Sequence, residues 1–218
     1  MNINDDFTQP VIVKSTSNPW VDTRMSGVKR RMLDRLGAES GRATTIVKYD
    51  PDSHFSNHIH TGGEEFLVLE GTFEDEHGKY PAGSYIRNPP QSQHSPSSDA
   101  GCTIFVKLEQ FDLEDRQHVN IRYDQLALTE QSPGIKSSVL FKDSREKVEL
   151  LQISAGQQFV GDASQGLEIL VLSGSLQYRS EQLVMHDWLR LPVNSTFKVN
   201  ASAQGATIWM KSGHLFFV

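Results

Sequence analysis

The sequence predicts an all-β protein made of two tandem copies of one β domain. Three observations support this prediction: β-rich segments alternate with turn residues, helical periodicity is scarce, and a block of sequence recurs 103 residues later. Short strands at regular spacing, punctuated by turns, are typical of sandwiches and barrels. The best candidate for a helix is a short stretch near residues 28–36.

Three segments of the first half have the composition of strands. They cover residues 44–49, 65–69 and 102–108, where Val, Ile, Thr, Phe, Leu and Tyr predominate. Turn residues lie between them, for example Asp-Pro-Asp at 50–52 and Thr-Gly-Gly at 61–63. This order of strands and turns favours an all-β sandwich or barrel.

An internal repeat extends the same architecture to the second half. Three blocks recur in order at offsets of 103 or 104 residues: 65–71 as 168–174, Pro89 as Pro192, and 101–107 as 205–211. Because chance rarely produces three matches in order, we predict two domains, at residues 1–112 and 113–218. The polar stretch 112–136 between them is either a linker or an added edge strand.

Composition narrows the class of protein. The 218-residue chain has a net charge of −6, which argues against nucleic-acid binding as its main activity. Its longest apolar runs are about five residues, whereas a membrane-spanning helix needs about 20, so we expect no membrane insertion. The start resembles no secretory signal, and the lone Cys102 cannot form an internal disulfide, so we expect a cytoplasmic protein.

A cluster of potential metal ligands lies in the first copy. His58 and His60 alternate on a β-rich segment and therefore point to the same face. The glycines at 62–63 allow the chain to reverse and return the Glu64 carboxylate, and His94 comes from another strand. Neutral imidazoles with one carboxylate suit Zn, Fe, Mn, Co or Ni, and this set leaves positions open for a further ligand.

These segments resemble the two signature motifs of the cupin superfamily. Residues 60–83, 85–94 and 101–107 are similar to the ChrR-type cupins, and the close match covers about residues 44–110. In that family the domain forms the C-terminal part of an anti-sigma factor that restrains an extracytoplasmic-function sigma factor. One departure is Gln91, where the cupin pattern usually has Gly.

The resemblance implies a double-stranded β-helix, a jelly-roll-like barrel with the metal inside one end. It implies the ligands His58, His60, Glu64 and His94, and it favours zinc as the single divalent ion. Cupins commonly dimerise through sheet edges, so we expect a homodimer. Sigma-factor binding is not expected, because residues 1–40 lack the His and Cys ligands of the zinc-binding anti-sigma domain.

The second copy does not repeat the ligand set. Glu64 corresponds to Leu167 and His94 to Phe197, while the two histidines of the first motif correspond to Gly161 and Ala163, or to Asp162 and Ser164 in the alternative register. Leu and Phe at ligand positions would fill a barrel with apolar volume. We therefore predict a metal-free second cupin that has a structural or partner-binding role.

The residues leave the function open between classes. A regulatory or sensory metal-binding protein is the first hypothesis. A metal-dependent dioxygenase or isomerase acting on a small organic molecule is the alternative, because open metal positions can activate oxygen or polarise a carbonyl. A metal-free interaction protein is the third. Glu65 should point away from the metal and form a structural contact, and Cys102 should be buried without a redox role.

Overall fold

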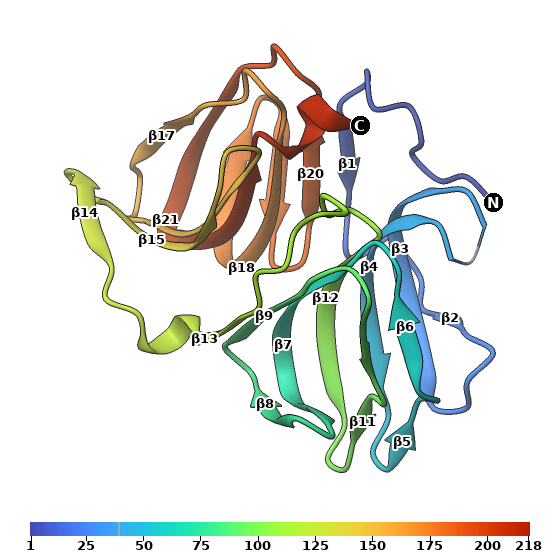
Figure 1. Ribbon diagram of the computed structural model, residues 1–218. Coiled ribbons are helices and arrows are strands. Elements are labelled where there is room, and N and C mark those ends of the chain that lie inside the picture. The colour runs from blue at the N-terminus through green and yellow to red at the C-terminus, as the bar shows by residue number, and fades with distance from the viewer. Residues whose placement is uncertain (39) are drawn as a thin grey trace. The chain divides into compact units, whose positions relative to one another are not determined.

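A computed structural model describes residues 1–38 and 40–218 of the chain. The described chain forms two compact units (Figure 1). The first combines Met1–Asp5 with Pro19–Asp124, and the second combines Asp6–Asn18 with Gln125–Val218. Both consist of antiparallel strands, which confirms the predicted all-β class. Neither of the two 3-10 helices in the described chain, η1 (Tyr123–Gln125) and η2 (His214–Phe217), meets the length and hydropathy that a membrane-spanning helix needs.

The first unit contains a ten-stranded sheet and a separate two-stranded sheet. The main path of the large sheet runs β13-β9-β7-β12-β4-β3-β2, and the small sheet pairs β10 with β6. The strands of this unit are β2 (Val21–Asp22), β3 (Val28–Leu36), β4 (Arg42–Tyr49), β5 (Ser53–His54), β6 (His58–His60), β7 (Glu64–Asp75), β8 (Gly78–Pro81), β9 (Ser84–Asn88), β10 (Ser92–His94), β11 (Ser97–Ser98), β12 (Cys102–Leu108) and β13 (Val119–Arg122).

The second unit contains one nine-stranded sheet. Its main path runs β1-β20-β18-β21-β16-β15-β14, with β17 paired to β21 and β19 paired to β18. The strands of this unit are β1 (Val11–Val13), β14 (Thr129–Ser132), β15 (Ile135–Lys142), β16 (Lys147–Ile153), β17 (Gln158–Gly161), β18 (Leu167–Tyr178), β19 (Glu181–Val184), β20 (Trp188–Leu191) and β21 (Phe197–Ser212).

The helix considered near residues 28–36 is wrong, because this segment is strand β3. It pairs with β4 from Val28, opposite Tyr49, to Leu36, opposite Arg42. This pairing buries Val28 and Leu33, whose apolar side chains would otherwise remain in water. Burial against a neighbouring strand thus outweighs a weak local helical preference.

The two compact units divide the chain differently from the expected boundary between residues 112 and 113. Strand β13 lies beyond that boundary, yet it pairs with β9 of the first unit through contacts such as Ile121 opposite Tyr85. Part of the polar joining stretch is therefore an edge strand. Residues 6–18 group with the second unit, where Val11 of β1 lies opposite Arg190 of β20.

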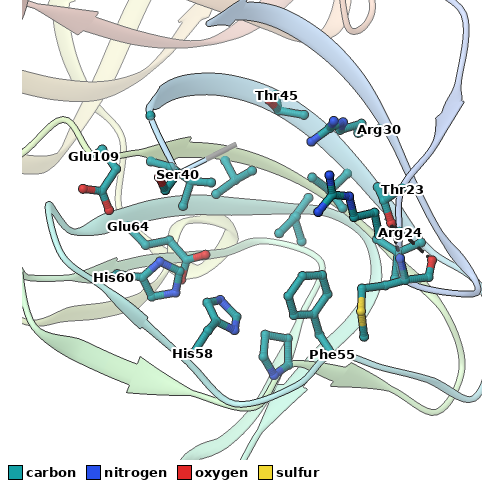
Figure 2. A pocket seen from close by; sticks show the side chains of 18 of the residues that line it. Thr23, Arg24, Arg30, Ser40, Thr45, Phe55, His58, His60, Glu64 and Glu109 are labelled. Carbon is teal, nitrogen blue, oxygen red and sulfur yellow. Dashed lines mark hydrogen bonds and ion pairs between the residues drawn. The ribbon is translucent and has the colours of Figure 1, made fainter. Parts of the chain in front are cut away.

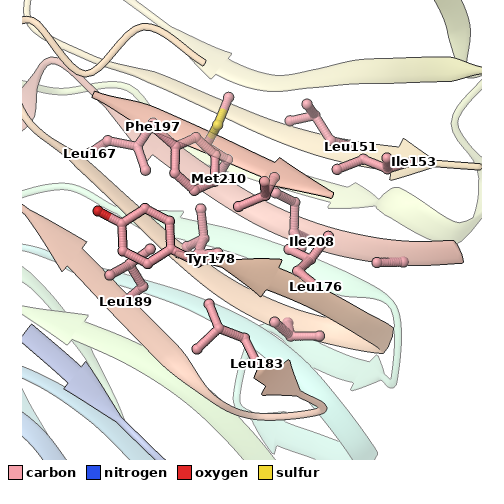
Figure 3. Packing of buried hydrophobic residues seen from close by; sticks show 14 of the residues in the cluster. Leu151, Ile153, Leu167, Leu176, Tyr178, Leu183, Leu189, Phe197, Ile208 and Met210 are labelled. Atoms are coloured by element: carbon pink, nitrogen blue, oxygen red, sulfur yellow. The ribbon is translucent and has the colours of Figure 1, made fainter. Parts of the chain in front are cut away.

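The second unit is filled by an apolar cluster (Figure 3). Leu167 and Phe197, which stand where the first copy has Glu64 and His94, are fully buried in this cluster. Ala163 also lies in it. The side chains at these positions pack with other apolar groups, as the sequence predicts for a barrel filled by hydrophobic volume.

A buried ionic cluster stabilises the first unit on the side of β7 that faces away from the histidines. Arg87 Nη1 lies 3.6 Å from Glu65 Oε2, and Arg87 Nη2 donates to Asp115 Oδ2 at 2.9 Å. The Tyr85 hydroxyl donates to Glu65 Oε1 at 2.7 Å. The predicted structural role of Glu65 is confirmed, and so is the burial of Cys102, whose pKa is raised to about 11 mainly by desolvation.

We expect Arg87→Ala to lower the free energy of unfolding by about 3–5 kcal/mol, because it leaves two buried carboxylates without their cation. Denaturant titration of the full chain measures this loss. Arg122→Ala is the control, since its pair with Asp124 is partly exposed and should contribute about 1 kcal/mol or less. Equal effects of the two substitutions would contradict the assignment.

Candidate metal centre

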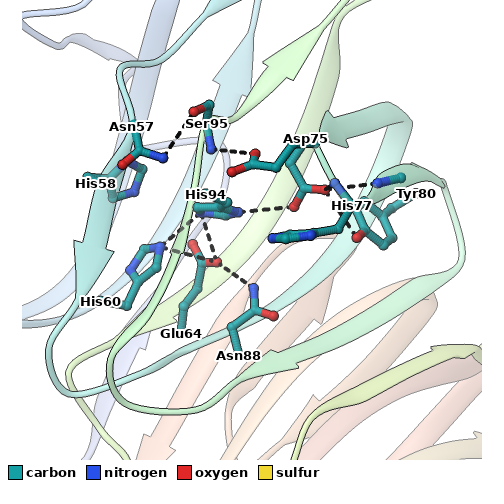
Figure 4. Close-up of polar contacts among 12 residues, drawn as sticks. Asn57, His58, His60, Glu64, Asp75, His77, Tyr80, Asn88, His94 and Ser95 are labelled. Atoms are coloured by element: carbon teal, nitrogen blue, oxygen red, sulfur yellow. Dashed lines mark hydrogen bonds and ion pairs between the residues drawn. The ribbon is translucent and has the colours of Figure 1, made fainter.

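The register of a two-stranded ribbon brings the three predicted histidines together (Figure 4). Strand β10 runs antiparallel to β6, with His94 directly opposite His58 and Ser92 opposite His60. His58 and His60 are two residues apart, so their side chains share one face of the ribbon. His94 joins them on that face because directly opposed residues of an antiparallel pair point to the same side.

The imidazole rings converge on a common point. His60 Nε2 and His94 Nε2 lie 2.9 Å apart, and one ring nitrogen from each of the three histidines lies within 4.8 Å of the others. The ring centroid of His58 is 4.6 Å from that of His60 and 5.2 Å from that of His94. His60 and His94 are buried, whereas His58 is half-buried at the edge of the cluster. This arrangement can hold a metal ion.

Glu64 returns to the same point after the Gly-Gly turn. Its Oε2 lies 3.5 Å from His60 Nε2 and 3.4 Å from His94 Nε2. The turn requires glycine at Gly63, whose φ is +81° and where an added Cβ would lie 2.6 Å from the Phe111 ring. The four residues named from the sequence are therefore neighbours in space.

Two further residues orient the cluster, and no local sequence signal marks either of them. Asp75, at the far end of β7, accepts a hydrogen bond from His94 Nδ1 at 3.2 Å. Asn88 lies directly opposite Glu64 in the β7–β9 pair and donates to Glu64 Oε2 at 3.2 Å. Asp75 and Glu64 stand at opposite ends of β7, so only the fold places both near His94.

These contacts set the tautomers of two imidazoles. His94 Nδ1 faces a carboxylate, and His58 Nδ1 lies 2.9 Å from the carbonyl oxygen of Ser56. Both partners accept hydrogen bonds, so each Nδ1 carries the hydrogen and donates it. The Nε2 atoms of His58 and His94 consequently keep their lone pairs available for a metal.

Burial and neighbouring charges act on the pKa values of this cluster in different directions. Desolvation lowers the pKa of His60, with Glu64 only partly opposing it. At His94 desolvation also lowers the pKa, but the hydrogen bond to Asp75 and the charge of Glu64 together outweigh it and raise the pKa. Burial raises the pKa of Asp75, yet its hydrogen bonds from His94 and the His77 amide leave it below the ordinary value.

A cavity of about 520 Å³ adjoins the histidines within the first unit (Figure 2). His58, His60 and Glu64 line it together with an apolar wall that includes Val47 and Val106. A volume of this size is in the usual range for small-molecule sites. Three of the four metal-ligand candidates therefore line a cavity that can admit a small molecule.

Other residues considered from the sequence have no part in the cluster. His54 is exposed and does not belong to the three-histidine group. Gln91 has a φ of +71°, which explains why glycine is usual at this turn. The backbone N–H of Gln91 donates to the carbonyl oxygen of His60 at 2.8 Å. Within residues 1–38 and 40–218, no second group of three potential metal ligands accompanies the histidine cluster.

Comparison with known proteins supports the fold and the resemblance stated above. Residues 8–112 match the model of the family described as the ChrR Cupin-like domain. No curated protein matches the chain. The match covers most of the first unit, including every residue of the candidate centre.

Three solved structures share the fold over nearly the whole chain. A Nostoc punctiforme protein assigned provisionally as a dioxygenase is 18% identical, with a TM-score of 0.78, and the alignment covers 97% of this chain and 85% of that chain. A pirin from Escherichia coli in complex with nickel(II) is 13% identical, with a TM-score of 0.72 and coverage of 94% and 99%. Bacillus subtilis oxalate decarboxylase, with Mn(II) centres, is 12% identical, with a TM-score of 0.66 and coverage of 93% and 76%.

We expect Asp75→Asn to weaken metal binding about 10–100-fold, because the carboxylate orients His94 and strengthens it as a ligand. Competition with a chromophoric chelator measures the affinity. Asp99→Asn serves as the control, since its exposed carboxylate pairs with Lys79 rather than with a histidine. An unchanged affinity in Asp75→Asn would contradict the orienting role.

Proposed function

We propose that this two-cupin protein, whose residues 8–112 form a ChrR cupin-like domain, holds one divalent metal ion and acts as a regulatory or sensory protein. The proposed ligands are His58, His60, Glu64 and His94. The metal would lie among the three histidines, with the Glu64 carboxylate beside His60 and His94 as the fourth ligand. Small-molecule binding at this centre would be the signal that the protein registers.

One observation carries the proposal: the facing nitrogens of His60 and His94 lie 2.9 Å apart beside a carboxylate, in a buried place. The lone pair of His94 Nε2 points into this space because Asp75 holds the hydrogen on the opposite ring nitrogen. Several electron-pair donors so close together favour a cation between them. The donor chemistry therefore fits a divalent metal.

Each neighbouring residue has a defined part in this arrangement. Asp75 fixes the ring of His94, the Ser56 carbonyl fixes that of His58, and Asn88 holds the carboxylate of Glu64. A metal bound here would act as a Lewis acid toward an oxygen atom of a bound molecule. We favour zinc because of the ChrR resemblance, although three imidazoles and a carboxylate also suit Fe, Mn, Co and Ni.

The second unit is proposed to be metal-free and structural. Leu167 and Phe197 offer no electron pair where the first copy has Glu64 and His94, and both are buried in the apolar cluster. A charged ion in that place would lose its hydration without gaining ligands. The first cupin would therefore bind the metal, and the second would have a structural role.

A metal-dependent dioxygenase or isomerase is the alternative, because the cavity of about 520 Å³ next to the histidines would admit a substrate to the metal. The same cavity would admit the small molecule of the sensory hypothesis. The structurally similar protein assigned provisionally as a dioxygenase is consistent with this alternative at the level of fold.

We expect natively purified protein to contain about one divalent ion per chain, because one of the two units has the ligand set. His58→Ala combined with His94→Ala should reduce the content to nearly zero by elemental analysis. His77→Ala is the matched control, because His77 is an exposed turn residue outside the cluster. Two tightly held ions per chain, or metal retained in the double variant, would contradict the proposal.

Oxygen consumption separates the sensory from the enzymatic hypothesis. If the protein is sensory, the Fe(II)-loaded and zinc-loaded forms should show no sustained oxygen uptake with aromatic or diketone compounds. The measurement uses an oxygen electrode, with the metal-deficient double variant as the blank. Turnover by the Fe(II)-loaded form alone would instead support the dioxygenase.

A further inference from the structure

We propose that the cavity beside the metal centre binds a small organic acid whose carboxylate is held by Arg30, Thr45 and Arg24. The inference rests on the proposed function, because the other end of that molecule would face the metal. The cavity has a cationic end, an apolar middle and a histidine end, all within the first unit (Figure 2). Each part restricts the chemistry of the ligand.

The cationic end follows from the pairing of β3 with β4. Arg30 lies directly opposite Val47, and both side chains line the cavity. Thr45 is two residues from Val47 on the same face of β4, so it is a diagonal neighbour of Arg30. Arg24 reaches the cavity from the turn between β2 and β3. Two guanidinium groups and one hydroxyl thus line the same part of the wall.

The hydroxyl of Thr45 is a buried polar group with which a ligand in the cavity could form a hydrogen bond. Thr45 is only 3% exposed, and its Oγ1 has no hydrogen-bond partner in the described part of the chain. Leaving a buried hydroxyl unsatisfied costs free energy, and a ligand oxygen in the cavity would remove that cost.

Charge sets the orientation of the ligand. Glu64 and Glu109 line the histidine end, and Glu109 accepts a hydrogen bond from the Thr61 hydroxyl at 2.8 Å. With a divalent metal bound, these two carboxylates balance its charge, whereas Arg24 and Arg30 attract an anion at the opposite end. Guanidinium groups match the geometry of a carboxylate, with two parallel donors for its two oxygens.

The middle of the cavity requires an apolar body. Its wall contains Val47 and Tyr49 from β4 and three alternate residues of β12: Ile104, Val106 and Leu108. Inorganic phosphate or a sugar phosphate would leave this wall in contact with polar groups and gain nothing from it. An acid with an aromatic or branched aliphatic body would bury the wall and still reach the arginines.

Benzoate and its neutral isostere benzamide test the proposal on the zinc-loaded full chain by titration calorimetry. We expect benzoate to bind about tenfold or more tightly than benzamide, because a hydrogen-bonded charge pair adds this much discrimination. Arg30→Met should remove that preference while benzamide binding stays within about twofold. Thr45→Val, which keeps the volume of the side chain, should weaken benzoate binding by a smaller factor.

The neighbouring Arg31 is the matched control, because its guanidinium stacks on Trp20 at 4.5 Å and does not line the cavity. Arg31→Met should leave both affinities unchanged. If Arg30→Met does not fold, the preference for benzoate over benzamide is measured instead in Arg24→Gln, at an exposed turn, and in Thr45→Val. Undetectable benzoate binding at millimolar concentration, equal affinities for the two probes, or a preference that survives in Arg30→Met and Thr45→Val would overturn the proposal.

The metal-free double variant His58→Ala with His94→Ala separates this inference from the proposed function. Retention of the benzoate preference without metal supports the arginine site independently of the metal. Loss of the preference only in that variant would mean that the metal, not Arg30, selects the carboxylate, and would overturn the inference. Elemental analysis of the wild-type chain decides the metal proposal without reference to either probe.

Discussion

The antiparallel pairing of β6 with β10 is the constraint on which the candidate centre depends. It sets His94 opposite His58, and strand alternation then places His60 on the same face. A slip of one residue in this register would turn His94 to the other side of the ribbon. Gln91 lies at the turn leading into β10 and has a positive φ. Its backbone N–H donates to the His60 carbonyl oxygen, so this turn also holds β10 against β6.

The two units keep a glutamate opposite an arginine at matching strand positions and differ in their chemistry. Glu65 lies directly opposite Arg87 in the first unit, and Glu168 lies directly opposite Arg190 in the second. Removing one member of a buried charge pair costs several kcal/mol, about 3–5, which makes such pairs hard to replace singly. The metal-ligand positions carry no such penalty, because Leu or Phe can fill the space with apolar volume.

His58, His60 and the apolar wall line one continuous cavity with opposite electrostatic ends. Carboxylates of Glu64 and Glu109 stand near the imidazoles, and the guanidinium of Arg30 stands on β3. Such polarity orients a ligand before any close contact is made, since the field acts over the width of the cavity. A metal at the histidine end would reduce the negative charge there and leave the cationic end unchanged.

Prediction from sequence succeeded where the signal is short-range. The spacing of His58, His60 and Glu64 follows from strand alternation and a glycine turn, and the internal repeat revealed the two-copy architecture. The segment near 28–36 was misjudged because its local pattern does not reveal the burial that β4 provides. The structural roles of Asp75 and Asn88 were not foreseen, because each contacts its partner across strands rather than along one.

By itself, the sequence determined the all-β class, the repeat and the residues proposed as metal ligands, because alternation and turn chemistry are local properties of the chain. Only the tertiary structure decided which strands pair, and therefore which residues support the histidines. It also decided that Arg30 and Thr45 share a cavity with them. Cross-strand register joins residues far apart in the chain, and no local pattern encodes it uniquely.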